Sequence, residues 1–589
     1  MNKLLLLAAL AGCASPPPAP PKLAMGDHET LRNHMTSVIR EGMKKDKVTG
    51  LSIALVDDQQ VIWSQGFGWA DADAHLPATD RTLYRTGSIS KLFTSTAAVQ
   101  LAQRGLLDLD APIQQALPGF GIAAQATEQA ITPRLLMTHH AGLTRDKGEG
   151  MWGSEVGHFQ DMVHKLNAHD QDYPAGLLFS YSNVGMTVLG AAIERVARKP
   201  FEAHIQSTLL QPLGMETAFF SSAPGPGLSR AHQDGRPVKE LALRDTPAGG
   251  LNASVLDMSR FMMMVFANGK SPNGPTILEP EHMADMLRIQ NAYNALDLDQ
   301  HTGLGWMLNR HGPNGLRDGG LVAHHNGATN HFRSQMYALP EHKLGVIVMA
   351  NSASSAQLVD NVAKQALAMA LEAKTGLQQP PEKPEFVAAE TPISEEQFQT
   401  WPGDYATNVG HARVLREGKT LKVHAMQKVL HLSPATGGGM GLRYKLLGLI
   451  PMPINDFKSF TLLRKQVDGR ELLIARSGGQ EVLVGERLNP QPDPRAAAWV
   501  GKYTPRSKNG EEPVEHIELR LDEHVLLATV HMTETEGGTT EVLPLRLVSE
   551  NEARVLRPLA DFGATVRLGE FDGRPGFEVS GIVFVRTSP

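Results

Sequence analysis

The 589-residue sequence contains a single cysteine, Cys13, which has no partner in the chain for a disulfide bond. Aromatic residues make up only 6% of the chain, and no apolar run reaches the roughly 18 residues that a membrane-spanning helix needs. Basic runs are also lacking, because 56 Lys and Arg face 62 Asp and Glu, for a formal charge of -6. A slightly acidic chain lacks the patch of positive charge that binds nucleic acid, so we expect no nucleic acid partner.

The composition that remains is that of packed globular protein. Hydrophobic residues make up 41% and charged residues 20% of the chain, which excludes extensive disorder. A chain of this length favours several domains over one.

The N-terminus has the pattern of an exported protein. A single positive charge at Lys3 precedes the apolar run Leu4–Leu10, which is typical of a secretory signal peptide and too short for a spanning helix. The run continues into Leu-Ala-Gly-Cys13, which resembles the lipobox of bacterial lipoproteins, where cleavage before the cysteine leaves a lipidated thiol. We therefore predict a lipoprotein signal peptide over 1–12 and lipidation at Cys13. The alternative is an ordinary signal peptide with an incidental cysteine.

The residues after Cys13 indicate where such an anchor would lie. Ala14 and Ser15 follow, and the resemblance to lipoproteins implies that a chain without Asp at this point goes to the outer membrane. We expect an exported envelope protein, anchored in the outer membrane and facing the periplasm. Residues 13–25 are rich in proline and predict a stiff spacer.

Residues 26–375 mix helical and strand patterns. Apolar spacing predicts helices over 31–45 and 90–105, and strands over 51–56, 61–63 and 344–349. The strands come from both ends of the segment, so we expect an α/β (α+β) domain in which helices flank an antiparallel sheet.

The composition changes at residue 376. Residues 376–392 are rich in Pro, Gln and Glu and predict a linker. Beyond it, short alternating runs between glycine-rich turns predict two all-β domains over 393–488 and 495–589. A W-x-G-x-Y pattern opens each of them, at Trp401–Tyr405 and at Trp499–Tyr503.

Three short motifs carry candidate chemistry. Gly87–Lys91 opens a predicted helix and places Ser88 and Lys91 on one face, where the lysine reaches the hydroxyl and the positive helix end favours an oxyanion. S-x-x-K is a weak motif on its own. Tyr181–Asn183 (Y-S-N) offers a phenol and an amide, and His325–Gly327 (H-N-G) puts a donor beside a glycine on a strand that a substrate backbone can approach.

Together, S-x-x-K, Y-x-N and H-x-G in this order resemble the serine β-lactamase and penicillin-binding protein superfamily. The Y-x-N form resembles its class C β-lactamase, DD-peptidase and D-aminopeptidase branch. The resemblance covers nearly all of residues 30–370. Further segments similar to that branch are Leu135–Leu143, Ala248–Leu251 with Ser254 and Asp257, and Gly303–Trp306.

The resemblance implies acyl transfer through a covalent acyl-serine intermediate. Ser88 would be the nucleophile, and either Lys91, with a pKa depressed by desolvation, or Tyr181, whose phenolate the same positive field favours, would be the base. The implied oxyanion hole is the backbone N–H groups of Ser88 and Ala328. The implied substrate-binding residues are Asn183, His325, Asn326 and Gly327.

Two histidines depart from the branch's β-lactamases. His325 stands where they carry the lysine of K-T-G, and a mostly neutral histidine holds a β-lactam carboxylate less firmly. His331 stands where the family usually has glycine, which narrows the expected pocket. We therefore expect a peptidase or amidase for D-amino-acid or peptidoglycan-type peptides first, then an esterase, then a weak β-lactamase. A catalytically silent binding protein is the alternative of another class.

The resemblance also implies the architecture. Bacterial serine D-aminopeptidases carry a helical subdomain and two trailing lipocalin-like barrels, so we expect the two β-domains to be barrels of that kind. No H-E-x-x-H or paired Cys/His spacing appears, and we expect no metal and no cofactor. The sequence leaves the oligomeric state open.

Overall fold

The computed structural model describes residues 20–123, 128–148, 150–168, 171–310, 315–379, 385–446, 450–452, 459–506, 514–533, 539–557 and 564–588. The predicted signal peptide and its lipidation site, Cys13, lie outside the described residues. No helix in the described ranges is long and apolar enough to cross a membrane.

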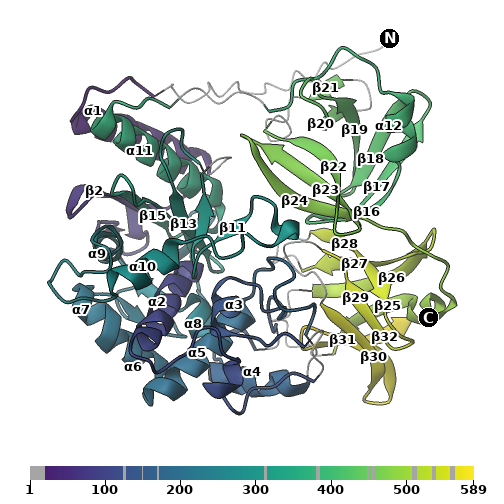
Figure 1. The fold of residues 1–589 in the computed structure, drawn as a ribbon, viewed down its shortest axis with the longest axis horizontal. Helices are drawn as coiled ribbons and strands as arrows, with labels where there is room; N and C mark the ends of the chain where they lie inside the picture. The colour runs from purple at the N-terminus through teal and green to yellow at the C-terminus, as the bar shows by residue number, and fades with distance from the viewer. Residues whose placement is uncertain are drawn as a thin grey trace, which may run out of the picture.

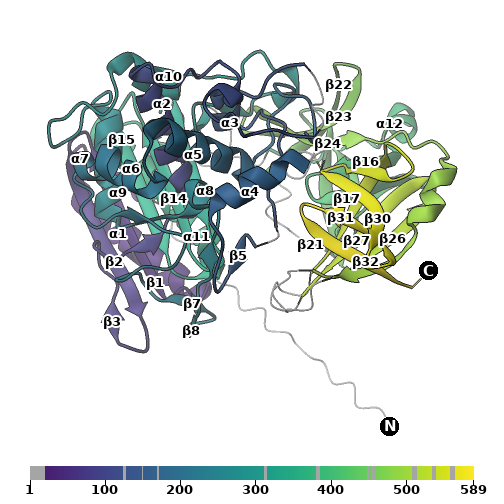
Figure 2. The same ribbon diagram turned by 90° about the horizontal axis from the view of Figure 1, so that it is seen from below.

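Three bodies follow one another along the chain. Figure 1 shows an α/β body, coloured purple to teal, beside two β-barrels in green and yellow that lie one above the other. Figure 2, turned by 90°, shows the same separation of the helix-rich body from the barrels.

The α/β body is built on an eight-stranded antiparallel sheet in the order β11-β12-β13-β14-β15-β1-β2-β3. Strand β1 pairs with β15, so the two ends of the domain meet at the centre of the sheet, as the sequence predicts. The strands are β1 (Gly50–Asp57), β2 (Gln60–Asp71), β3 (Leu76–Pro77), β11 (His301–Thr302), β12 (Met307–Asn309), β13 (Val322–Ala328), β14 (Arg333–Leu339) and β15 (Leu344–Ala350).

Two helices cover one face of this sheet. In α1 (His28–Lys45), buried Leu31, Met35, Ile39 and Met43 recur every four residues and form one apolar stripe. This stripe packs with α11 (Ala356–Thr375) and the outer side of the sheet into one hydrophobic core.

The opposite face carries the larger core and the helical subdomain. Helix α2 (Ser90–Gln103) is buried almost all round, because it passes through the middle of this core. The other helices here are α3 (Pro133–Met137), α4 (Phe159–Lys165), α5 (Asn183–Ala197), α6 (Phe201–Ile205), α7 (Gln211–Leu213), α8 (Thr246–Gly249), α9 (Val255–Phe266) and α10 (Pro280–Leu287). Short strands connect them: β4 (Tyr84–Arg85), β5 (Trp152–Gly153), β6 (Phe219–Phe220), β7 (Ala231–Gln233), β8 (Arg236–Val238), β9 (Ala242–Leu243) and β10 (Leu251–Ala253).

The first β-domain is a closed barrel, because a pairing of β19 with β20 joins the two ends of its sheet. Its strands are β16 (Gly403–Thr407), β17 (Gly410–Glu417), β18 (Thr420–Ala425), β19 (Lys428–Pro434), β20 (Met440–Leu446), β22 (Thr461–Val467), β23 (Arg470–Ser477) and β24 (Gln480–Arg487), with β21 (Ile450–Met452) added beside β20. A short helix, α12 (Glu395–Thr400), precedes it and begins with a capping box between Ser394 and Gln397. The prediction of an all-β domain omits this helix.

The second β-domain is a closed eight-stranded barrel. Its strands are β25 (Gly501–Pro505), β26 (Val514–Asp522), β27 (Val525–Met532), β28 (Thr540–Leu547), β29 (Glu552–Val555), β30 (Thr565–Phe571), β31 (Arg574–Val579) and β32 (Ile582–Ser588). The expectation of two barrels behind a β-lactamase-like domain is therefore confirmed.

The W-x-G-x-Y repeat forms the same structure in both barrels. The Tyr405 hydroxyl donates a hydrogen bond to the Trp401 carbonyl at 2.8 Å, and the Tyr503 hydroxyl donates to the Trp499 carbonyl at the same distance. All four aromatic side chains are buried in the barrel cores. The repeated motif is thus a repeated corner at the entry to each barrel.

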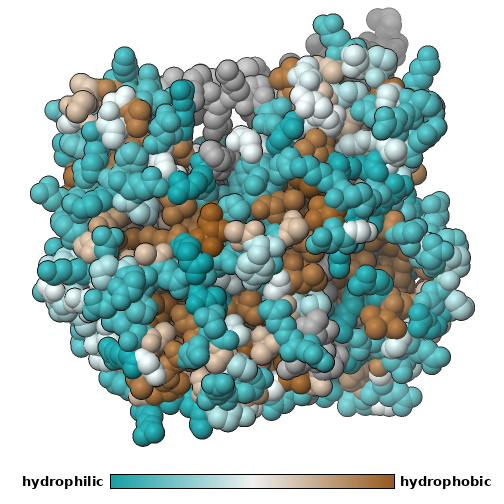
Figure 3. All heavy atoms as spheres, viewed as in Figure 1, coloured by the Kyte–Doolittle hydropathy of each residue, from teal (hydrophilic) through white to brown (hydrophobic). Residues whose placement is uncertain are grey.

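The first barrel packs on the α/β body through apolar side chains. In Figure 3 hydrophilic side chains dominate the edge of the visible face, and hydrophobic ones gather toward its middle. The buried residues of this interface are Tyr173, Leu178 and Leu296 of the body with Leu472, Ile474 and Leu483 of the barrel. The Asp299 N–H donates a hydrogen bond to the Glu481 carbonyl at 3.0 Å and extends the contact.

The second barrel contacts a loop, residues 144–148, on the same side of the body. The Gly148 N–H donates to the Ser580 carbonyl at 3.0 Å, in the turn between β31 and β32. The ammonium group of Lys147, which is buried, lies 3.6 Å from the Glu578 carboxylate. This barrel therefore holds the 144–148 loop in place.

Candidate active site

Ser88 lies on a tight turn that joins β4 to α2. Residues Gly87–Ile89 form a 3-10 turn, and Gly87 has φ +55°, a backbone conformation that glycine adopts without strain. A Cβ at this position would lie 2.6 Å from the Ala328 nitrogen. The turn is thus held directly against the end of β13, and Ser88 is half-buried between them.

Lys91 points from the first turn of α2 onto Ser88. Its Nζ donates hydrogen bonds to Ser88 Oγ at 3.1 Å and to the Ala248 carbonyl at 2.8 Å, and the side chain is completely buried. Burial lowers the pKa of Lys91 to about 7, although the negative charge of Asp146 acts to raise it. Lys91 can therefore be a free amine beside the serine at neutral pH.

Tyr181 is the second group that touches Ser88, and it shares a hydrogen bond with the serine side chain. Lys91 Nζ lies 4.9 Å from the centre of its ring. Burial raises the pKa of Tyr181, and the hydrogen bond from Ser88 and the charge of Arg145 do not cancel that effect. The positive charge of Arg145 does favour the phenolate, as expected, but desolvation outweighs it and the hydroxyl keeps its proton.

These two pKa shifts separate the candidate bases. A buried phenol keeps its proton and can pass one on, whereas Lys91 loses its proton near neutral pH. The geometry favours Lys91 as the base and Tyr181 as a neutral hydroxyl relay.

Asn183 lies at the first position of α5, where the Ser182 side chain caps the helix by accepting the Gly185 N–H at 2.8 Å. The Asn183 side-chain amide donates to Asp146 Oδ1 at 2.6 Å. One amide hydrogen is therefore already engaged, and Asp146 fixes the orientation of the group expected to hold the substrate.

His325 lies on β13 with its ring centre 6.3 Å from that of Tyr181. Its Nδ1 lies 2.6 Å from the Asn326 carbonyl and donates to it, so the neutral ring presents Nε2 as an acceptor. Burial and the Lys91 charge lower the pKa of His325 to about 3. A neutral, buried histidine does not supply the charge that binds a carboxylate.

The remaining residues of the third motif line the edge of β13. Asn326 is exposed, on the strand face opposite His325. Gly327 leaves no room for a side chain, because a Cβ there would overlap the Thr86 carbonyl oxygen. Ala328 follows at the position closest to Gly87, which brings together the two backbone segments of the expected oxyanion hole.

Three further residues, which lie outside the three motifs, surround Tyr181 and Asn183. The ring of His139 lies 4.4 Å from that of Tyr181, and its Nδ1 accepts the Ser182 N–H at 3.1 Å. The Arg145 guanidinium lies 5.2 Å from the centre of the Tyr181 ring, and Asp146 binds Asn183. His139 is part of the family-like segment Leu135–Leu143, but its φ of +62° is not readable from sequence.

Three other histidines of the α/β body form contacts within the scaffold. His140 Nε2 lies 2.7 Å from the buried carboxylate of Asp297, and His324 Nε2 lies 2.6 Å from the Asn309 side chain. His331 is paired with Glu240 at 2.9 Å. His140 and His324 therefore stabilise the scaffold through these contacts.

A serine with a buried lysine and a buried tyrosine hydroxyl beside it is the arrangement that nucleophilic acyl transfer requires. The profile described as Beta-lactamase matches residues 35–370, more than half of the chain. The chain belongs to this family.

Curated relatives match the same region. "Protein flp" from Staphylococcus aureus (strain NCTC 8325 / PS 47) is 25% identical over 332 residues, which cover 54% of this chain and 63% of Flp. "Esterase EstB" from Burkholderia gladioli is 27% identical over 232 residues, 37% of this chain and 59% of the esterase. The chain thus spans less than two thirds of the length of each relative.

Solved structures are similar over a larger part of the chain. SurE has a TM-score of 0.55 at 22% identity, covering 78% of this chain and 100% of SurE. The octameric penicillin-binding protein homologue from Pyrococcus abyssi has a TM-score of 0.50 at 22% identity, covering 77% and 99%. At these identities the similarity establishes the fold.

Proposed function

We propose that this enzyme hydrolyses an amide bond in D-amino-acid or peptidoglycan-type peptides through an acyl-Ser88 intermediate. The observation that carries the proposal is Lys91, completely buried with its Nζ 3.1 Å from Ser88 Oγ. The neutral His325 supports a peptide over a β-lactam, because it stands where the branch's β-lactamases carry a lysine that holds the β-lactam carboxylate.

The geometry supports the following sequence of proton transfers. Lys91, as the free amine, takes the Ser88 proton while Oγ attacks the substrate carbonyl, and the backbone N–H groups of Ser88 and Ala328 hold the oxyanion. The Tyr181 hydroxyl gives its proton to the leaving amine and regains one from the Lys91 ammonium. Water, deprotonated by the same base, then releases the acid from Ser88.

The substrate amide would lie between Asn183 and the edge of β13. Asp146 orients the Asn183 amide, and Asn326 is exposed on the strand. A peptide placed there as an added strand would pair with the backbone of β13 beyond His324, where the pairing of β13 with β12 ends.

An esterase is the second candidate. It is favoured by the 27% identity to EstB and by the neutral form of His325. An ester leaving group needs less help from a proton donor than an amine does. Weak β-lactamase activity is the third.

Labelling tests the nucleophile. Wild-type protein should take up a fluorophosphonate or fluorescent penicillin, and Ser88→Ala should not, while the exposed Ser37→Ala on α1 serves as the matched control. A wild type that takes up neither reagent would contradict the assignment of Ser88. A panel of D-Ala and L-Ala amides, p-nitrophenyl esters and nitrocefin then separates the activities: cleavage of esters alone would favour the esterase.

We further propose that Cys13 anchors the enzyme in the outer membrane by a lipid, facing the periplasm. The support is the Leu10–Cys13 segment behind an apolar run, and the absence of any other cysteine. In detergent phase separation the wild type should enter the detergent phase and Cys13→Ala the aqueous phase. Wild-type protein in the aqueous phase would refute the anchor.

A further inference from the structure

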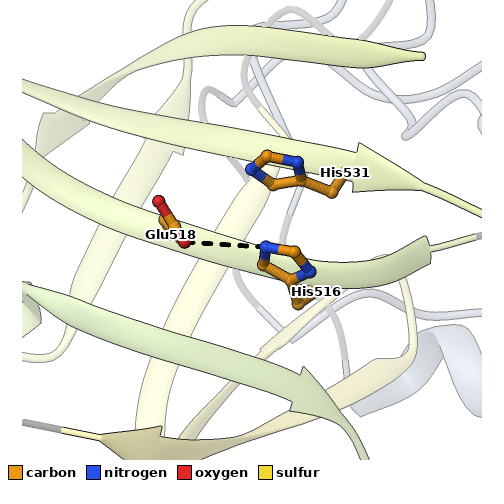
Figure 4. A group of neighbouring side chains, drawn as sticks. All are labelled: His516, Glu518 and His531. Carbon is orange, nitrogen blue, oxygen red and sulfur yellow. Dashed lines mark ion pairs between the residues drawn. The ribbon is translucent and has the colours of Figure 1, made fainter. Parts of the chain in front are cut away.

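Two histidines and a glutamate converge on the second barrel, in a part of the molecule that takes no part in the hydrolase site. His516 and Glu518 lie on β26, and His531 lies on β27, directly opposite His516 in the strand register. Figure 4 shows the three side chains together on the surface of the two strands. Within the described residues this is the one group of three potential metal ligands.

All three side chains are on the outer face of the barrel. Ile517 and Leu519 alternate with His516 and Glu518 along β26, and they belong to the barrel core. The same alternation on β27 places Val530 inside and His531 outside. The outward position places the group outside the packed core of the barrel.

The ligand atoms are close enough for one small ion. The imidazole rings lie 4.0 Å apart with 14° between their planes, and His516 Nε2 lies 3.6 Å from the Glu518 carboxylate. One ligand atom from each residue lies within 4.8 Å of the other two. A tetrahedral ion with bonds of about 2.0–2.2 Å needs ligand atoms about 3.4 Å apart, so the two rings would tilt toward each other to hold it.

In both histidines the contacts of Nδ1 leave Nε2 available to bind a metal ion. His531 Nδ1 lies 3.4 Å from Thr540 Oγ1, while its buried Nε2 has no hydrogen-bond partner among the described residues. Glu515 lies 3.6 Å from His516 Nδ1, the position of a carboxylate that orients a metal-bound histidine.

The site is closed on one side and open on the other. The His516 side chain is 13% exposed and that of Glu518 is 48% exposed. Lys502, 3.9 Å from Glu518, is the cation that a metal would displace from that carboxylate. An arrangement of two imidazoles and one carboxylate matches the His₂Glu donor set that binds zinc with a further position open.

We propose that His516, Glu518 and His531 bind one divalent transition-metal ion of the zinc type, which ties β26 to β27 on the outer face of the second barrel. The three residues are separated by up to fifteen positions and lack the spacing of a known zinc motif, so sequence reasoning predicts no metal here. The proposal does not depend on the substrate of Ser88.

Metal titration of the untagged full-length chain tests it. After treatment with EDTA, the protein should remove one equivalent of Zn²⁺ from a chromophoric chelator, and Co²⁺ should give visible absorption bands of a low-coordinate site. His531→Ala and Glu518→Gln should each weaken Zn²⁺ binding by at least about tenfold. His424→Ala, which removes an exposed histidine from the first barrel, should bind as the wild type does.

The controls separate loss of metal from loss of fold. Glu518→Gln keeps the size of the side chain, and its melting temperature without metal should equal that of the wild type, while Zn²⁺ raises only the wild-type value. Ser88→Ala should retain the metal. A wild type that binds no stoichiometric Zn²⁺, or a His531→Ala variant that binds it as tightly, would overturn the proposal and leave a stacked histidine pair.

Discussion

Lys91 is the residue whose environment decides the chemistry. Its burial lowers the pKa to about 7, so the fraction of free amine changes within the neutral range. We expect kcat/KM to fall as the pH drops through about 7, because the protonated ammonium cannot accept the Ser88 proton. The measurement is a pH–rate profile of the wild type. A profile that stays flat through this region would remove Lys91 as the base.

The same shift makes a prediction about stability. The unfolded lysine keeps its proton up to about pH 10.5 and the folded one loses it near 7, so the unfolded state binds more protons between these values. The free energy of unfolding should therefore rise with pH across this window. Lys91→Met should show a smaller rise and greater stability at neutral pH, as measured by urea unfolding at several pH values. An identical pH dependence in the two proteins would contradict the depressed pKa.

His139 is predicted to position Tyr181. Replacing it with alanine removes the ring against the phenol and the acceptor of the Ser182 N–H. Since small misplacements of a relay group are costly, kcat should fall by roughly tenfold to a hundredfold with a smaller change in KM. The exposed His164→Ala on α4 is the control. A change in KM alone would indicate a binding role instead.

At the scale of elements, the turn before α2 and the strand β13 form one unit. Gly327→Ala would push the Thr86 carbonyl oxygen away and separate Ser88 from Ala328. We expect a loss of roughly 1–3 kcal/mol in stability and a large fall in kcat. Gly119→Ala, where a Cβ meets open space, should change neither unfolding nor turnover. Wild-type kcat in Gly327→Ala would show that this contact does not set the oxyanion geometry.

The elements also show what the sequence can predict. The main helices and strands and the three motifs follow from local patterns, and the order of the motifs brings Ser88 and Tyr181 together. The pKa of Tyr181 does not follow, because its burial depends on the 144–148 loop and His139 folding over it. The contact between His516 and His531 does not follow from the sequence either, because the register of β26 and β27 is set only when the barrel closes.

At the scale of the whole molecule, the first barrel and the α/β body share a small apolar core. Ile474 is completely buried there between Tyr173 and Leu178 of the body and its own barrel. Ile474→Ala should cost roughly 2–5 kcal/mol and split thermal unfolding into separate steps for the two bodies. Calorimetry checks this, with the exposed Val429→Ala in the same barrel as the control. A single transition at the wild-type temperature would mean that the bodies are coupled elsewhere.

The second barrel acts on the site through one loop. Its Ser580 carbonyl holds Gly148, and the same loop supplies Arg145 to Tyr181 and Asp146 to Asn183. The catalytic residues come from the body, but their surroundings are completed by the C-terminal end of the chain.

The paired tryptophan–tyrosine corners give the two barrels a common starting point. In each barrel a buried tyrosine ties the first strand back to the tryptophan carbonyl four residues earlier, so the same local contact fixes where the chain enters. The outer faces are free to differ around this shared entry. The first barrel carries the apolar face that packs on the α/β body, and the second carries the paired imidazoles.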